Sequence, residues 1–584
     1  MILPYKKLKK NSTRIIADRH ASTYNFENQN ILLNLNCIIL SFYKKRNAMK
    51  HYYTFVLLTL FVFNSSFAQE LPEQFDLRDY NGENFVTSVK SQIDGTCWTH
   101  GAMAAIEGNL MMNANWTNAG LDGEPNLAEY HLDWWNGFNQ EFNQDTMPDD
   151  GSGLEVHYGG DYLVTSAYLS RGEGAIQDTA IEGYWHSNMP RRADTSYNYF
   201  YVRNIEWLAM GDSLERIDLL KTKIMENGVM GTCMAYNGQF IDYNYNHYQP
   251  PGSDVLPNHA IAIVGWDDNH PTDAPQPGAW LCKNSWGNSW GYSGYFWISY
   301  YDKWAGREPE MGAISFSNTV EPFFDTIYYH DYHGWRDTWT ESNTAMNAFS
   351  AVDSMSLKAV SFYTAADSVN YTCTIYDDFD TELSNSLGQV AGFIELKGFH
   401  TIDLPELIGI PEGDDFYLEL EFDKGGQPFD RTSEVPVLLC AENTRTVVHS
   451  TASESESFYK NDQGHWIDFY SEGDAFWEHS GNFCIKAIAD KGMEAGNGII
   501  SEPHTNIDIN VWPQPAKDRV NIALAGTHRG GKLYISNLSG QIVKSIHFGG
   551  KAQLQVDMSH LASGIYLYQI RTEDGMATGK LIKQ

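Results

Sequence analysis

The spacing of apolar side chains divides the chain into regions with different patterns of apolar and polar residues. Small and apolar residues recur over residues 97–110 at a spacing that predicts a buried, closely packed helix. Between about residues 316 and 490, segments such as 359–363 and 415–421 alternate apolar with polar positions, which predicts strands. Turn residues between these segments favour a β-sandwich, and residues 508–584 are again strand-rich and short enough for one small sandwich.

A chain of 584 residues is too long for a single hydrophobic core, so we expect several domains. We place their boundaries where the pattern of apolar and polar residues changes. Residues 69–315 mix helical patterns with strands, and residues 316–490 form the first strand-rich region. Residues 491–507 are a predicted linker rich in glycine and polar side chains, and residues 508–584 form the second strand-rich region.

An export signal precedes these regions. Tyr53–Phe63 form an apolar run of 11 residues, shorter than the ~20 residues that a membrane-spanning helix needs. Lys50 precedes this run and the small residues of Ser66–Ala68 end it, so residues 49–68 are predicted to be a secretory signal cut before Gln69.

The 48 residues before the signal are unusual, because a signal normally begins a few residues before its apolar run. Met49 stands where the start is expected. We interpret residues 1–48 as a mis-assigned upstream start. The alternative is a long cytoplasmic lead before an uncleaved signal anchor.

Net charge narrows the range of partners. The chain holds 74 acidic and 40 basic side chains, of which residues 1–68 contain 2 and 10, so 72 and 30 remain, a net charge of −42. Such an acidic surface repels phosphate groups, which disfavours nucleic acid and anionic lipid as partners. The seven cysteines are too few for a disulfide-stapled scaffold and lack metal-finger spacings, so we expect no metal and no other cofactor.

One cysteine stands where a nucleophile is expected. Cys97 begins the predicted helix, and the unpaired N–H groups and dipole of a helix start favour the reactive thiolate. An isolated Cys–Trp pair would more simply be a buried, inert cysteine. Here His259 follows 162 residues later at the start of an apolar strand, and Asn284 follows 25 residues after that, which is the chain order of papain-like peptidases.

Residues 71–300 resemble the papain (C1) family. The motifs that carry the resemblance are Leu71–Pro72, Phe75–Arg78, Val86–Thr87, Val89–Lys90, Gln92–Trp98, Asn258–Trp266 and the very specific run Asn284–Tyr295. The resemblance implies an α+β fold: a two-lobed, papain-like protease with a helical lobe and a β-barrel-like lobe, followed by two β-sandwich domains.

The same resemblance implies roles for individual residues. Cys97 would attack the peptide carbonyl, and His259 would form a thiolate–imidazolium pair with it and protonate the leaving amine. Asn284 would orient His259, and Trp286 would shield their hydrogen bond from water. Gln92 would stabilise the developing oxyanion together with the backbone N–H of Cys97.

Four residues are expected along the substrate cleft: Gly159, Gly160, Trp286 and Cys233. The two glycines resemble the family's segment whose backbone pairs with an extended substrate, where glycine permits a close approach. The alternative is an ordinary glycine turn. By alignment Cys233 would approach the wall of the pocket for the substrate's second side chain, although a small buried hydrophobe is the simpler interpretation.

Two positions depart from the family, which usually has a disulfide where this chain has Asp94 and His157. Both cysteines are missing together. We therefore expect the two side chains to form an ion pair, within ~4 Å of each other, in place of the bridge.

The middle region resembles the lectin-like β-sandwich that follows the protease in some bacterial and archaeal surface cysteine peptidases. Thr326–Asp331, Ala359–Tyr363 and Ser457–Asp468 carry this resemblance. The tyrosines and tryptophans of this region suit stacking on a carbohydrate or, more simply, a sandwich core.

The tail resembles the C-terminal sorting domain of type IX secretion, on the segments Val511–Ala516, Gly564–Tyr568 and Lys580–Gln584. The alternative is a small immunoglobulin-like stalk. The resemblance implies export through the periplasm and outer membrane by the type IX machinery, to the cell surface or the medium.

Together these observations predict a secreted cysteine endopeptidase that hydrolyses peptide bonds in protein or peptide substrates. Two alternatives stay open: a surface-binding protein that uses the same fold without turnover, and a cysteine amidase that acts on glycopeptides.

Overall fold

The computed structural model describes residues 71–140, 152–181, 183–437, 444–492, 509–517, 519–524, 530–536, 542–549, 553–559, 561–572 and 575–584. The predicted signal (49–68), the residues before it (1–48) and residues 493–507 of the predicted linker lie outside these ranges. Within the described ranges, no helix is both long and apolar enough to cross a bilayer.

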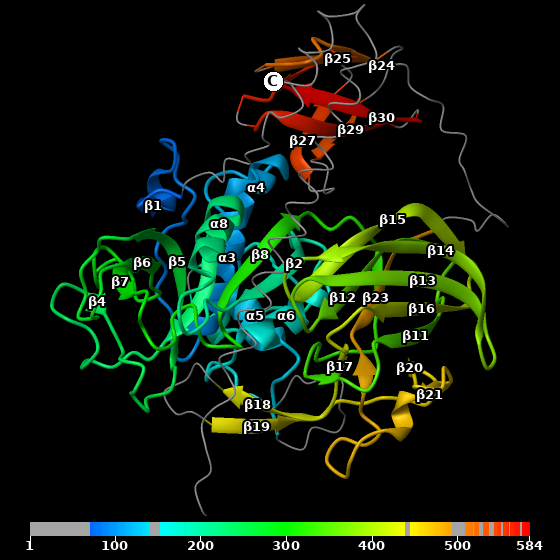
Figure 1. Ribbon diagram of the computed structural model, residues 1–584, viewed down its shortest axis with the longest axis horizontal. Coiled ribbons are helices and arrows are strands. Elements are labelled where there is room, and N and C mark those ends of the chain that lie inside the picture. The colour runs from blue at the N-terminus through cyan, green and yellow to red at the C-terminus, as the bar shows by residue number, and fades with distance from the viewer. Residues whose placement is uncertain are drawn as a thin grey trace, which may run out of the picture. The chain divides into compact units, whose positions relative to one another are not determined.

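Helix α3 (Cys97–Met112) is the central helix of the first region (Figure 1). Its residues are buried on every side over 97–110, so this part of the helix has no solvent face. Glycine permits the close packing, because a Cβ on Gly101 would lie 2.5 Å from the hydroxyl of Tyr162. The helix predicted over residues 97–110 is therefore confirmed.

Shorter helices accompany α3. They are η1 (Leu77–Asp79), α4 (Asn115–Asn118), α5 (Glu129–Trp135), α6 (Tyr162–Ser170), α7 (Tyr184–Ser187) and α8 (Ile217–Asn227). Helix α6 begins at a capping carboxylate, since Asp161 accepts a hydrogen bond from the backbone N–H of Val164 at 2.8 Å.

The strands of the first region belong to one mostly antiparallel sheet. They are β1 (Gln74–Asp76), β2 (Tyr201–Leu208), β3 (Met230–Met234), β4 (Asn246–His247), β5 (His259–Asp267), β6 (Ala279–Lys283), β7 (Tyr295–Ser299) and β8 (Ala313–Val320). Their order is β4-β7-β6-β5-β3-β8-β2, with β1 paired to β5. The first region is therefore the predicted two-part α+β arrangement of a helical side and a strand-rich side.

This sheet continues without a break into the second region. Strand β2 pairs with β15 (Gly398–Ile410), and the order then runs through β12 (Met355–Thr364), β23 (Ile485–Lys491) and β9 (Thr326–Tyr328) to make 12 strands (Figure 1). The junction requires glycine at position 398, where φ is 146° and a Cβ would collide with the carbonyl of Ile205. The predicted boundary at 315–316 falls inside β8.

A second sheet completes the sandwich of the middle region. Its order is β14-β13-β16-β11-β20-β21, and Phe416, Leu418 and Leu420 of β16 lie in the core between the sheets. The strands are β11 (Thr344–Ser350), β13 (Val369–Phe379), β14 (Leu383–Ile394), β16 (Asp415–Phe422), β20 (Ser457–Lys460) and β21 (Trp466–Asp468). Smaller pairings join β10 (Asp337–Trp339), β17 (Gln427–Asp430) and β22 (Asn482–Phe483), and join β18 (Ser433–Val437) to β19 (Thr444–Val448).

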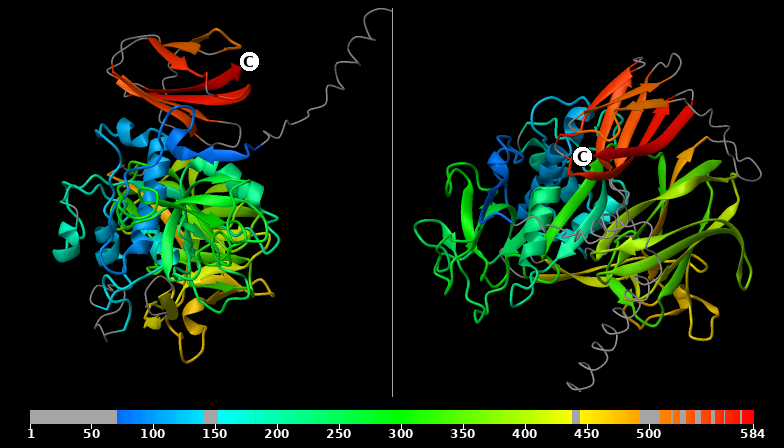
Figure 2. Two further views of the ribbon diagram at one scale, coloured as in Figure 1. Left: turned by 90° about the vertical axis from the view of Figure 1, so that its left-hand side faces the viewer. Right: turned by 45° about the horizontal axis from the view of Figure 1, so that its top comes forward.

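The last region is a separate small sandwich, as the strand-rich pattern of residues 508–584 predicts. Figure 2 shows its two layers, β24-β25-β28 and β27-β26-β29-β30. Val520, Ile522, Leu533 and Ile535 belong to the apolar core of this sandwich. The strands are β24 (Ile509–Trp512), β25 (Arg519–Leu524), β26 (Gly530–Ser536), β27 (Ile542–Gly549), β28 (Gln553–Asp557), β29 (Gly564–Thr572) and β30 (Gly575–Lys583).

Candidate active site

Cys97 is the first residue of α3 and is 2% exposed. No acidic side chain stands in the first turn, so nothing there offsets the positive end of the helix dipole. The helix packs against the start of β5 near its N-terminal end, because a Cβ on Gly101 would lie 3.5 Å from the Cβ of Ala260. The predicted nucleophile therefore lies on an element that contacts the strand carrying the predicted base.

His259 and Asn284 meet at one end of strands β5 and β6. The Nε2 atom of His259 lies 2.8 Å from Oδ1 of Asn284, which also accepts a hydrogen bond from the backbone N–H of Ser285 at 2.8 Å. That second bond identifies the amide oxygen, so Nε2 of His259 must carry the proton. The other ring nitrogen, Nδ1, is then free of the Asn284 bond and available for proton transfer.

Trp286 covers this pair. Its ring stacks on the ring of His259 with centroids 4.4 Å apart and an interplanar angle of 22°. Tyr236 and Trp290 pack edge-on against Trp286, at 4.6 and 5.1 Å between centroids. The hydrogen bond between His259 and Asn284 therefore lies under a wall of aromatic rings that keeps water away.

Burial decides the charge of His259. Removal from water lowers its pKa to about 4, although the hydrogen bond to Asn284 opposes this shift. An imidazolium at this position therefore needs an anion beside it to compensate for the lost hydration. A thiolate at Cys97 would supply that charge, which is the condition for a thiolate–imidazolium pair.

Gln92 is held against the loop that carries Asn284. Its backbone N–H donates to the carbonyl of Ser285 at 2.7 Å, and the hydroxyl of Ser285 donates to Oε1 of Gln92 at 2.6 Å. One N–H of the Gln92 amide donates to the carbonyl of Asp94 at 2.8 Å. Since the amide group has two N–H donors, the other is available to an oxyanion.

The predicted cleft residues differ in their surroundings. Gly160 is required by packing, because a Cβ there would lie 2.6 Å from the indole of Trp98, and Gly159 adopts a φ of 113° that favours glycine. Cys233 lies on β3 opposite Ala260 and is fully buried. Burial raises the pKa of the Cys233 thiol well above its usual value, which favours the interpretation as a small buried hydrophobe.

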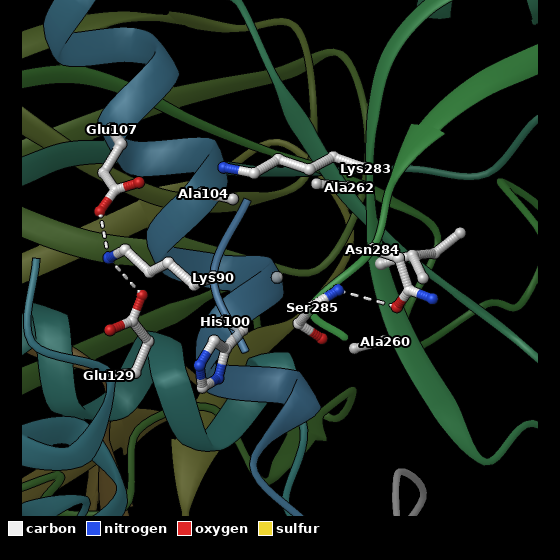
Figure 3. A pocket seen from close by; sticks show the side chains of 12 residues that line it. Lys90, His100, Ala104, Glu107, Glu129, Ala260, Ala262, Lys283, Asn284 and Ser285 are labelled. Carbon is white, nitrogen blue, oxygen red and sulfur yellow. Dashed lines mark hydrogen bonds and ion pairs between the residues drawn. The ribbon is translucent and has the colours of Figure 1, made fainter. Parts of the chain in front are cut away.

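A buried charge cluster that the sequence did not reveal lies beside the site (Figure 3). The ammonium group of Lys90 pairs with Glu107 at 2.8 Å and with Glu129 at 2.6 Å. Lys283 donates to the hydroxyl of Thr87 at 2.9 Å, and that hydroxyl donates to Glu107 at 2.6 Å. The only signals in the sequence were that Lys90 stands two residues before Gln92 and that Lys283 directly precedes Asn284.

This cluster ties the segment before Gln92 to the strand before Asn284 through α3. Burial opposes the charge of Lys90, but Glu107 and Glu129 outweigh that effect and raise its pKa. Burial lowers the pKa of Lys283 to about 8. The side chains surround a cavity of about 20 Å³, which has room for about one water molecule.

The predicted ion pair between Asp94 and His157 is wrong. Asp94 pairs with Nε2 of His186 at 3.0 Å, and Nδ1 of His157 pairs with Asp133 instead. The backbones do meet, since the N–H of Gly95 donates to the carbonyl of His157 at 2.7 Å. Other residues from α5 and α7 therefore satisfy the two side chains.

Two observations concern metals and thiols. Across the part of the chain that the structure describes, no group of three or more His, Cys, Asp or Glu residues is arranged to hold a metal ion. The cysteines within the described residues are buried and are not joined in disulfide bonds: Cys97, Cys233, Cys282, Cys373 and Cys484.

Comparison with protein families identifies three segments. Residues 165–312 match the model for "Papain family cysteine protease", residues 327–489 match "Lectin like domain", and residues 510–584 match "Secretion system C-terminal sorting domain".

Curated relatives of the first region include cathepsins. The viral cathepsin of Cydia pomonella granulosis virus (isolate Mexico/1963) is 26% identical over 232 residues, which are 39% of this chain and 57% of that protein. Cathepsin S of Mus musculus is 27% identical over 241 residues, which are 40% of this chain and 60% of that protein. The chain thus spans less than two thirds of these relatives.

Solved structures support the two-domain arrangement. The clostridial cysteine protease Cwp84 after propeptide cleavage aligns with a TM-score of 0.56 and 21% identity over 72% of this chain and 99% of its own. The protease and lectin-like domains of Cwp84, a surface layer associated protein of Clostridium difficile, align with a TM-score of 0.53 and 20% identity over 73% of this chain and 90% of their own. The fold is therefore a papain-like protease domain followed by a β-rich, lectin-like domain.

Proposed function

We propose that this chain, which carries a papain-family protease domain, a lectin-like domain and a C-terminal secretion sorting domain, is an exported cysteine endopeptidase. The observation that carries the proposal is the arrangement of His259, Asn284 and Trp286 beside the helix that begins at Cys97. A neutral, oriented imidazole near a cysteine at a helix start can act as the base that activates a thiol nucleophile.

Catalysis would proceed through an acyl-enzyme. The sulfur of Cys97 bonds to the carbonyl carbon of the scissile peptide, the C–N bond breaks, and His259 gives its Nδ1 proton to the leaving amine. A water molecule then attacks the thioester, loses a proton to His259 and releases the acid. Gln92 and the backbone N–H of Cys97 would stabilise the oxyanion of both steps, and loss of one such donor typically costs ~10²–10³ in rate.

The remaining domains bear on location and partners. The sorting domain supports export by a type IX secretion machinery, and we infer a place at the cell surface or in the medium. The glycines at positions 159 and 160 fit backbone pairing with an extended protein or peptide substrate. A carbohydrate partner rests only on the lectin-like character of residues 327–489.

Labelling with an epoxide probe of active-site thiols, followed by peptide mapping, tests this function. We expect label on Cys97 and on no other cysteine, together with casein cleavage that the Cys97→Ala variant lacks. A folded protein that takes no label and cleaves no casein would overturn the proposal and support the surface-binding alternative.

A further inference from the structure

Two chain segments that the proposed reaction needs lie side by side. One is the nucleophile loop, residues 92–97, and the other is the substrate segment, residues 157–160. Their backbones are joined by the hydrogen bond from Gly95 to His157 and by a bridge between Gly95 and Tyr158. The approach is close, because a Cβ on Gly95 would lie 2.9 Å from the carbonyl oxygen of His157.

Four side chains form a continuous connection beside this backbone contact. Nδ1 of His157 is hydrogen-bonded to Oδ2 of Asp133, and the ring of His157 stacks on the ring of His186 with centroids 3.9 Å apart and an interplanar angle of 22°. Nε2 of His186 then lies 3.0 Å from Oδ2 of Asp94. We name these four residues the histidine clasp.

The clasp joins the nucleophile loop to three other elements. Asp94 comes from the nucleophile loop, His157 from the substrate segment, Asp133 from α5 and His186 from α7. Side-chain exposure falls from 54% at Asp94 to 15% at His186, 14% at His157 and 1% at Asp133, so the clasp is anchored at its buried end.

Two residues of the clasp have strained backbone conformations. Asp94 has a φ of 55° and His157 a φ of 71°, in the left-handed region that side chains other than glycine rarely adopt. Such conformations persist only where surrounding contacts hold them. The clasp holds both residues, one at each of the two segments it joins.

An aromatic wall confines the two imidazoles. The ring of Tyr130 packs edge-on against His157 and His186, at 6.4 and 5.3 Å between centroids, and Trp134 does the same to His157 at 5.1 Å. The hydroxyl of Tyr130 also accepts a hydrogen bond from the backbone N–H of Ile93 at 3.2 Å. The wall therefore contacts the nucleophile loop as well.

We propose that the histidine clasp is a non-covalent cross-link that positions the nucleophile loop against the substrate segment, with His157 and His186 as positioning residues. This inference rests on the proposed peptidase function. The connection to the chemistry runs through Asp94, whose carbonyl accepts the hydrogen bond from the side-chain amide of Gln92. Release of Asp94 would free the oxyanion donor and the loop that precedes Cys97.

Charge gives the clasp a pH dependence. The titratable groups around His157 are Asp133 and Tyr130 from α5, His186 from α7 and Asp94 from the nucleophile loop. Burial opposes the charge of His157, but the hydrogen bond and charge of Asp133, aided by Asp94, raise its pKa above the usual value. Burial raises the pKa of Tyr130 to about 12, so this residue stays neutral at ordinary pH. The contact between His157 and Asp133 is thus strongest below the raised pKa of His157, and it weakens as pH rises through that pKa.

The His186→Ala variant of the full chain tests the proposal. We expect kcat/KM for a peptide substrate to fall about tenfold at neutral pH, because misplaced catalytic groups lose rate steeply with distance. The ratio of wild-type to variant rates should become smaller as pH rises through the pKa of His157, since the wild-type clasp weakens there. His186→Gln, which keeps an N–H donor for Asp94, should recover most of the loss, and His465→Ala, at an exposed turn, should match the wild type.

A second measurement does not depend on activity. Hydrogen exchange of the Gly95 amide should become about tenfold faster in His186→Ala, because the bond from Gly95 to His157 then opens more often. If the rate ratio is the same at every pH, or if exchange at Gly95 is unchanged in a folded variant, the clasp is overturned. Failure of the peptidase function itself would appear differently, as absent labelling of Cys97 in the wild type.

Discussion

Two histidines of the protease domain are held in opposite ways. His259 is 3% exposed, is hydrogen-bonded to the neutral amide of Asn284, and has a pKa that burial lowers to about 4. His157 lies between a carboxylate and a second imidazole, and its pKa is raised although burial opposes its charge. Burial opposes the charge of both rings. The carboxylate beside His157 outweighs this effect, whereas the neutral amide beside His259 does not.

The two arrangements suit two different roles, proton transfer and positioning. A ring that is neutral until a thiolate appears can exchange a proton during a reaction, because neither state is strongly trapped. A ring paired with a carboxylate holds a position but is a poor proton carrier. The first arrangement suits the proton transfer proposed for His259, and the second suits the positioning role proposed for His157.

The largest expected effect comes from removing the partner of His259. In Asn284→Ala, the Nε2–H group of His259 loses its acceptor and the ring is free to turn away from Cys97. We expect kcat/KM to fall on the order of 10²-fold, with KM little changed, because orientation matters mainly in the transition state. Steady-state kinetics on a peptide substrate measure this.

Asn288→Ala is the matched control for that variant, because Asn288 lies exposed in the same loop. It should retain the wild-type rate. Equal activity of Asn284→Ala and the wild type would show that His259 needs no orienting partner. The contrast between the amide partner of His259 and the carboxylate partner of His157 would then have no functional meaning.

A smaller effect is expected from opening the site to water. In Trp286→Ala, water reaches the bond between His259 and Asn284, and the pKa of His259 should rise from about 4 toward its ordinary value. Titration of His259 by NMR in the Cys97→Ala background measures this without interference from the thiolate. We expect kcat/KM of the single variant to fall about tenfold.

Trp286→Phe is the matched control in the same experiment. Phenylalanine keeps a ring over His259, so the pKa of His259 should stay close to the wild-type value. A pKa of His259 that does not move in Trp286→Ala would contradict burial as the cause of its low value.

The sequence predicted the parts of this comparison that depend on local pattern. The helix after Cys97 follows from the small residues over 97–110, and the meeting of His259 with Asn284 follows from the resemblance of short motifs around each. In these cases the residues that matter stand next to the residues that identify them.

Contacts assembled from distant segments were not predicted. His186 comes from a short helix with no motif, and it is this residue, not His157, that pairs with Asp94. The cluster around Lys90 draws its members from four separate segments, and the sheet that crosses from β2 to β15 depends on a single glycine at position 398. No local spacing records such neighbours, because only the folded chain brings them together.

The smallest expected effect is on the free energy of unfolding of the protein, to which the protonation of His157 contributes. Its folded pKa is raised above the unfolded value, so its contribution is fully present below the ordinary histidine pKa and is lost as pH rises through the folded pKa. In Asp133→Asn the charge that raises this pKa is gone, while burial remains and lowers it. We therefore expect a loss of about 1 kcal/mol in the free energy of unfolding at pH 6, shrinking toward pH 9. Urea unfolding across this range, with the exposed Asp462→Asn variant as control, measures the difference. A loss that is constant with pH would mean that Asp133 acts through packing alone, and His157 would then resemble His259 more than this structure indicates.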